Sequence, residues 1–222
     1  MKLFDQGRVG VKICGITNEP DAAMCIDAGA TALGFNFYIG SKRFIDPDKS
    51  FEWIRSLERT VDRVAVVVNA DADLLSRLCD SGCFEFIQFH GDESPAECMV
   101  CGAQDWIRAV RVKDTSALDA ALEFSTPHLL LDSWSPAAYG GTGDVADWKM
   151  LREFVRRNSA RKFLLAGGLT PGNVGEAIRM VRPAAVDVAG GVESEPRRKD
   201  AVLVKAFLNA AARGLHLEGD SP

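Results

Sequence analysis

The run Val11-Lys12-Ile13-Cys14-Gly15-Ile16-Thr17 decides the fold class of this 222-residue chain. Its apolar alternation ends at Cys14, which predicts a short strand, and Gly15 then permits a tight turn. The pair Thr17-Asn18 can cap a following helix. Because strand residues two apart point the same way, Lys12 and Cys14 are expected to share a face. Cys14 would then lie at the carboxyl end of a strand, where parallel α/β proteins carry out their chemistry.

The same strand-then-helix pattern occurs eight times along the chain. Strands are expected at 11–14, 32–37, 63–68, 86–89, 106–112, 128–131, 162–166 and 185–189. Helices are expected at 19–28, from 47, at 71–79, from 95, at 116–124, at 147–155, from 171 and at 199–213. This order predicts one (β/α)8 TIM-barrel domain over residues 1–222, with a flexible tail at 214–222. A doubly wound open sheet is the alternative, but it usually carries G-x-G-x-x-G in its first turn, which 14–17 does not match.

Composition restricts the class of protein. The hydrophobic content of 47% is enough for a large core, and the net charge is −5. An acidic chain without a basic run argues against a nucleic-acid partner. No stretch reaches the ~18 apolar residues of a membrane span, and the first ten residues lack the apolar core of a signal peptide. We therefore expect a cytoplasmic protein with neither a nucleic-acid nor a membrane partner.

Two cysteine pairs, Cys79-x3-Cys83 and Cys98-x2-Cys101, loosely resemble the spacing of a four-thiolate zinc site. Both pairs, however, have helical spacing rather than the tight turns that zinc ribbons favour. A cytosolic protein keeps such thiols reduced. We therefore interpret the four cysteines as packing residues and predict no metal.

Two glycine pairs follow the last two expected strands. Gly167 and Gly168 come after strand 162–166, and Gly190 and Gly191 come after strand 185–189. In TIM barrels these two loops commonly bind phosphate through backbone amides. Two ordinary tight turns are the alternative, but the position on consecutive strands favours a phosphate site.

Two residues are candidates for acid–base chemistry. Asp132 closes the apolar strand 128–131, where a partly desolvated carboxyl group can keep its proton and act as a general acid. Cys14 is its natural base partner across the barrel mouth, and Lys12 would favour the thiolate. The alternatives are a cysteine that only packs in the core and an aspartate that only caps a turn.

Three further polar residues are candidates for binding. The planar fork of Arg43 suits a carboxylate, unless this arginine is a solvated surface charge. His90 shares a face with Gln88 at the mouth and is either a ligand group or a turn residue. Asp187 would be costly to bury without a partner, so it could accept a substrate N–H.

These residues lie in motifs that together resemble the phosphoribosylanthranilate isomerase family. The motifs occur in order over most of the chain: VKICGIT at 11–17, GF at 34–35, SKR at 41–43, QFHGDE at 88–93, LD at 131–132, GGTG at 140–143, GGLTPGNV at 167–174, VDV at 186–188 and GVE at 191–193.

The resemblance implies a cofactor-free Amadori rearrangement of N-(5-phosphoribosyl)anthranilate in tryptophan biosynthesis. It implies that Cys14 is the general base and Asp132 the general acid. It also implies that Arg43 holds the anthranilate carboxylate and Asp187 the bridging amine. Substrate contacts are further expected from His90 and from glycines of the motifs, namely Gly141, Gly167, Gly168, Gly190 and Gly191. The enzyme would be a monomer or a homodimer, which the sequence does not distinguish.

The chain departs from the family pattern at three places. Ala189 and Gly190 stand where serines are common, Ile39-Gly40 replaces Pro-Lys, and Arg197 replaces a glycine. Two other functions stay open: a paralogue acting on another aminoribosyl phosphate, and a non-catalytic protein that binds a phosphorylated sugar. The presence of both acid and base positions disfavours the second, because a binding protein needs neither.

Overall fold

A computed structural model describes residues 2–5, 7–99, 105–132 and 148–216. Its eight parallel strands pair in chain order and close into a barrel, because β1 pairs with both β2 and β8. The strands are β1 (Gly10–Cys14), β2 (Ala32–Asn36), β3 (Asp62–Val67), β4 (Phe86–Phe89), β5 (Asp105–Arg111), β6 (His128–Asp132), β7 (Lys162–Ala166) and β8 (Ala185–Val188). The TIM-barrel prediction is therefore confirmed.

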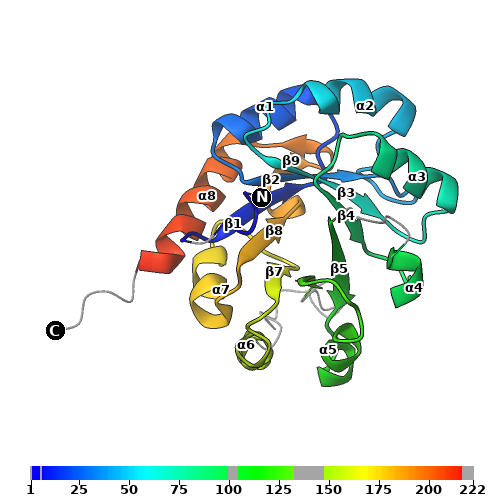
Figure 1. Cartoon of the computed structure of the whole chain (residues 1–222). Coiled ribbons are helices and arrows are strands. Elements are labelled where there is room, and N and C mark those ends of the chain that lie inside the picture. The colour runs from blue at the N-terminus through cyan, green and yellow to red at the C-terminus, as the bar shows by residue number, and fades with distance from the viewer. Residues whose placement is uncertain (1, 6, 100–104, 133–147, 217–222) are drawn as a thin grey trace.

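The helices lie around the outside of this barrel (Figure 1). They are α1 (Glu19–Asp27), α2 (Pro47–Ser56), α3 (Ala72–Asp80), α4 (Pro95–Cys98), α5 (Thr115–Ala121), α6 (Trp148–Arg157), α7 (Val174–Val181) and α8 (Ala201–His216). Asn18 caps α1 as expected, since its side chain accepts from the amide of Asp21 at 2.8 Å. Ser94 and Glu97 form a capping box at the start of α4. Along this described part of the chain, no helix has the length and apolar character to span a membrane.

Two segments differ from the prediction for the last third of the chain. Helix α7 begins at Val174 rather than near Pro171, because the Asn173 side chain accepts from the amide of Thr170 at 2.8 Å and so closes a separate turn. A turn η3 (Gly190–Val192) and a small hairpin, β9 (Glu193–Glu195) with β10 (Arg198–Lys199), precede α8. Helix α8 therefore starts at Ala201, not at Lys199, and it continues through Gly214 to His216.

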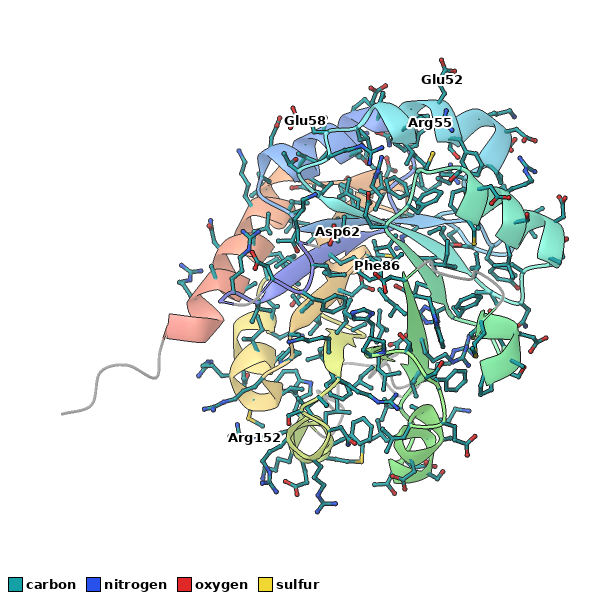
Figure 2. The ribbon with its side chains drawn as sticks, in the orientation of Figure 1. Glu52, Arg55, Glu58, Asp62, Phe86 and Arg152 are labelled. Atoms are coloured by element: carbon teal, nitrogen blue, oxygen red, sulfur yellow. The ribbon has the colours of Figure 1, made fainter. Side chains whose placement is uncertain are left out.

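The barrel is filled and closed at its amino-terminal end. Alternate strand residues such as Val64, Phe86, Ile107 and Leu164 point inward and pack with Leu3 and Phe4. Figure 2 shows Asp62 and Phe86 inside the ring of strands, whereas Glu52, Glu58 and Arg152 project outward. Asp62 can be buried there because its carboxylate accepts hydrogen bonds from the backbone amides of Lys2 and Leu3. Space for a ligand is thus left at the carboxyl ends of the strands.

Candidate active site

A cavity of about 480 Å³ lies at the carboxyl ends of the strands. It is lined by nine of the residues expected in the site, namely Cys14, Arg43, His90, Asp132, Gly167, Gly168, Asp187, Gly190 and Gly191. Asn36, Val66, Gln88, Ala166, Leu169, Val188 and Ala189 complete the lining. The predicted contact from Gly141 lies outside the described residues. The barrel therefore gathers into one cavity the residues that chain order had placed on separate strands.

Lys12 and Cys14 share a face of β1, as the strand pattern predicted. A Cβ at Gly34 would lie 2.7 Å from Cys14 Sγ and 2.9 Å from Lys12 Nζ, so only glycine leaves room for both side chains. The sequence analysis missed this role of Gly34, because the constraint comes from the neighbouring strand. Lys12 is fully buried and its Nζ donates to Asp187 Oδ1 at 2.8 Å.

These charges act on the Cys14 thiol in opposite directions. Burial raises its pKa, Lys12 lowers it and Asp187 raises it, so that the net pKa of Cys14 lies above its ordinary value of 9.0. Lys12 lowers the pKa of Cys14, as the sequence predicted, but desolvation of the thiolate outweighs this effect. Burial also lowers the pKa of Lys12, but Asp187 and Cys14 more than offset it, so Lys12 stays cationic.

Arg43 reaches the cavity from the loop between β2 and α2 and forms a two-pronged ion pair with Glu193. Its Nε donates to Glu193 Oε1 at 2.7 Å and its Nη2 to Glu193 Oε2 at 2.5 Å. Among the residues that the structure describes, its Nη1 has no hydrogen-bond partner. Glu193 thus occupies one edge of the guanidinium and leaves the Nη1–Nη2 edge for an incoming carboxylate.

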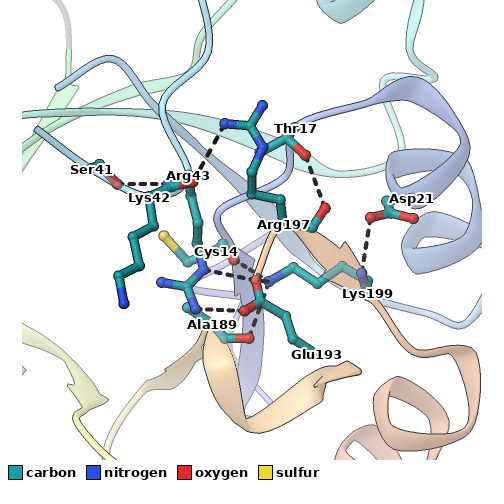
Figure 3. A network of polar contacts seen from close by, with 10 residues as sticks. All are labelled: Cys14, Thr17, Asp21, Ser41, Lys42, Arg43, Ala189, Glu193, Arg197 and Lys199. Atoms are coloured by element: carbon teal, nitrogen blue, oxygen red, sulfur yellow. Dashed lines mark hydrogen bonds and ion pairs between the residues drawn. The ribbon is translucent and has the colours of Figure 1, made fainter. Parts of the chain in front are cut away.

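Lys199 joins this pair to the strand ends and was not predicted as a site residue. Its Nζ donates to Cys14 O at 2.6 Å, Ala189 O at 3.1 Å and Glu193 Oε1 at 2.9 Å. Figure 3 shows the ammonium between the ends of β1 and β8, with Glu193 linking it to Arg43. No local pattern in the sequence indicated it, since these contacts depend on where β10 lies relative to β1.

The opposite side of the cavity carries Gln88, His90 and Asp132. Gln88 Nε2 lies 3.1 Å from His90 Nδ1. An amide nitrogen only donates, so Nδ1 accepts in this contact. His90 Nε2 lies 3.5 Å from Asp132 Oδ2. Within the described ranges, the buried Gln88 Oε1 has no hydrogen-bond partner, so it can accept a hydrogen bond from a ligand.

The glycine pairs after β7 and β8 lie side by side on the rim of the same cavity. Gly167 and Gly168 have φ values of +91° and +63°, which favour glycine. A Cβ at Gly191 would lie 2.0 Å from Leu169 O, so the two loops touch through their backbones. This close approach creates the backbone surface expected of a phosphate site.

Comparison with known protein families shows which family this chain belongs to. Residues 11–210 match the family described as N-(5'-phosphoribosyl)anthranilate (PRA) isomerase. The chain belongs to this family. A Trichlorobacter lovleyi N-(5'-phosphoribosyl)anthranilate isomerase is 42% identical over 207 residues, which cover 93% of this chain and 100% of that protein.

Solved structures of the family agree with this membership. The crystal structure of phosphoribosyl anthranilate isomerase from Thermotoga maritima is 38% identical, with a TM-score of 0.83 over 91% of this chain and 98% of that one. A second family structure, in complex with reduced 1-(o-carboxyphenylamino)-1-deoxyribulose 5-phosphate, is 36% identical with a TM-score of 0.81 over the same shares. The resemblance noted in the sequence is therefore confirmed.

One departure from the family pattern has a structural consequence. Arg197, which the sequence marks as a departure from the family pattern, has a left-handed φ of +79°. Its Nη1 donates to Phe44 O at 3.1 Å and to Lys42 O at 3.4 Å. The arginine therefore ties the hairpin to the loop that carries Arg43, which a glycine could not do.

Proposed function

We propose that Cys14 and Asp132 catalyse the isomerase reaction of this family as general base and general acid. The reaction belongs to tryptophan biosynthesis and converts N-(5-phosphoribosyl)anthranilate into 1-(o-carboxyphenylamino)-1-deoxyribulose 5-phosphate. The observation that carries the proposal is that both residues line one cavity from opposite sides of the barrel, on β1 and β6.

The chemistry needs one proton delivered and one removed. Asp132 would donate its proton to the ribose ring oxygen while the bond from that oxygen to the anomeric carbon breaks. This leaves a protonated imine between the anomeric carbon and the anthranilate nitrogen. The Cys14 thiolate would then take the proton from the second sugar carbon, which gives a neutral enolamine. Ketonisation of the enolamine yields the product, so no atom is lost or gained.

The remaining cavity groups suit the rest of the substrate. The Nη1–Nη2 edge of Arg43 can hold the anthranilate carboxylate. Asp187 uses Oδ1 for Lys12, and its other oxygen can accept from the bridging amine. The loops at Gly167-Gly168 and Gly190-Gly191 can bind the phosphate through amide groups.

Asp132 also has a neighbour that affects its orientation. His90 Nε2 lies 3.5 Å from Asp132 Oδ2, close enough to influence how the carboxyl group is turned. We therefore assign His90 to orienting the acid, in addition to its position in the substrate cavity.

Complementation tests the function directly. The gene should restore growth without tryptophan to an auxotroph that lacks this isomerase, and the purified protein should convert N-(5-phosphoribosyl)anthranilate. A paralogue acting on another aminoribosyl phosphate would convert the anthranilate compound poorly. A binding protein would retain the ligand without turnover.

The cellular setting is proposed along with the reaction. The described cysteines are free thiols, as in a reducing compartment, which supports a cytoplasmic location. Sedimentation analysis would distinguish a monomer from a homodimer.

A further inference from the structure

We propose that Lys199 and Glu193 are positioning residues of this active site. Together they fix the relative positions of Cys14, the loop after β8 and Arg43. This inference rests on the proposed roles of Cys14 and Arg43. Neither Lys199 nor Glu193 lines the cavity, so both would act through the residues that do.

Lys199 joins the ends of two strands from behind the cavity. Its side chain is fully buried, and its three ammonium hydrogens have three acceptors: Cys14 O, Ala189 O and Glu193 Oε1. Cys14 ends β1, and Ala189 immediately precedes the Gly190-Gly191 loop. One cation therefore fixes the backbone of the base and the backbone that leads into the phosphate loop.

Glu193 connects this cation to Arg43. Its side chain is 4% exposed and accepts from Arg43 Nε, Arg43 Nη2 and Lys199 Nζ. Burial raises the pKa of Glu193, but the hydrogen bonds from Arg43 and Lys199 outweigh it, so the net pKa lies below its ordinary value of 4.5. Glu193 therefore stays anionic at neutral pH and holds the guanidinium by one edge.

The β9–β10 hairpin, which carries Glu193 and Lys199, is itself held in place by hydrogen bonds. The amide of Lys199 donates to Asp21 Oδ2 at 2.9 Å on α1. Thr17 Oγ1 donates to the carbonyl of Arg197 at 3.1 Å. These contacts, drawn in Figure 3, tie the second half of the hairpin, Arg197 to Lys199, to the segment after β1.

The positive charge of Lys199 should also affect the ionisation of Cys14, which can be measured. The charged groups that face Cys14 are Lys12 on β1, Asp187 on β8, Lys199 on β10 and Arg43 on the loop after β2. Lys199 is one of the cations that favour the thiolate. Its removal should therefore lower the thiolate fraction, which a purely structural role would not do.

The test uses Lys199→Met, Lys199→Arg and Glu193→Gln, with Lys205→Met as the control for loss of an exposed charge on α8. The rate of Cys14 alkylation by iodoacetamide is followed against pH by mass spectrometry of the Cys14 peptide. We expect Lys199→Met to slow the alkylation of Cys14 at least about threefold at pH values below the midpoint of the wild-type rate profile. Lys199→Arg should restore much of this rate, and Lys205→Met should match the wild type.

Steady-state kinetics provides the second readout. Glu193→Gln should raise KM for N-(5-phosphoribosyl)anthranilate more than it lowers kcat, because Arg43 loses its fixed edge. If Lys199→Met fails to fold, Lys199→Gln takes its place, because glutamine keeps a hydrogen-bond donor without the charge. Unchanged Cys14 alkylation in folded Lys199→Met or Lys199→Gln, together with kcat/KM within about twofold of wild type, would overturn the proposal.

These outcomes can be told apart from a failure of the catalytic assignment. The alkylation readout depends only on the Cys14 thiol and not on turnover. If Cys14 proved not to be the base, the Cys14→Ser enzyme would remain active while the alkylation of Cys14 would still report on Lys199.

Discussion

The two sides of the cavity are built differently. Around Cys14, the charged groups are buried: the side chains of Lys12 and Lys199 are fully inaccessible and that of Glu193 is 4% exposed. Around Asp132, the side chains are more open, since His90 is 24% and Asp132 22% exposed. There the Gln88 amide contacts the His90 imidazole, which lies next to Asp132.

This difference indicates how each catalytic group is controlled. Removing one partner of a buried ion pair costs about 3–5 kcal/mol, so the charges around Cys14 hold a fixed geometry and set its ionisation. On the Asp132 side, we propose that the neighbouring His90, whose Nε2 lies 3.5 Å from Asp132 Oδ2, orients the acid. Substitutions should therefore alter the base through charge and the acid through hydrogen-bond geometry.

The largest effect should come from Cys14→Ser on the charged side. A serine hydroxyl is far too weak an acid to supply a base at neutral pH, so we expect a loss of about 10³-fold in kcat/KM. Steady-state assays would measure it, with Cys79→Ser on α3 as the control that keeps activity. A Cys14→Ser enzyme near the wild-type rate would show that Cys14 is not the base.

Asp132→Asn should have the next largest effect. The asparagine keeps the shape of the acid but has no proton acidic enough for ring opening, and we expect at least about a hundredfold loss in rate. Steady-state assays would measure it, and an enzyme within about threefold of wild type would show that Asp132 is not the acid.

The raised pKa of Cys14 predicts how the reactivity of this thiol depends on pH. Because iodoacetamide reacts with the thiolate, the alkylation rate of Cys14 in the wild type should keep rising with pH beyond 9.0, the ordinary pKa of this thiol. A profile from about pH 6 to about pH 10.5 would measure it, and a rate that levels off near neutrality would contradict the burial argument.

Gly190→Val should affect binding more than turnover. A Cβ at Gly190 would lie 3.3 Å from Arg43 Nη2, so the branches of valine would press on the guanidinium and the phosphate loop. We expect KM to rise about tenfold, the cost of one hydrogen bond of ~1.4 kcal/mol, with a smaller change in kcat. Inorganic phosphate should compete with substrate in the wild type and compete less well in the variant. No competition at high phosphate concentration would place the phosphate elsewhere.

Arg197→Gly should have the smallest effect. Glycine removes a left-handed strain of about 1 kcal/mol but loses the exposed hydrogen bonds to Phe44 O and Lys42 O, worth about half as much. We expect Tm to rise by about 1–2 °C and KM to rise about twofold as the Arg43 loop loosens. Arg198→Gly, in the same hairpin without the left-handed backbone, is the control that should not gain stability. A fall in Tm of the Arg197 variant would show that the hydrogen bonds outweigh the strain.

The sequence by itself determined the barrel and most of the residues that line its mouth. Strand alternation depends on residues two apart, so β1 and the shared face of Lys12 and Cys14 could be identified locally. Because the carboxyl ends of parallel strands meet at one rim, Cys14, Asp132 and the glycine loops could be assigned to one site from chain order alone. The same argument could not find Gly34, whose constraint comes from side chains of the neighbouring strand.

Tertiary structure alone decided how the base side is held and how it ionises. Arg43 and Glu193 are 150 residues apart in the chain, and Lys199 is 185 residues from Cys14. Hydrogen bonds of 3 Å or less, such as the 2.6 Å contact from Lys199 to Cys14 O, depend on the placement of a hairpin that local patterns did not reveal. The pKa of Cys14 depends on the balance between desolvation and the nearby cations. Both quantities are set by distance and burial, which residue order does not contain.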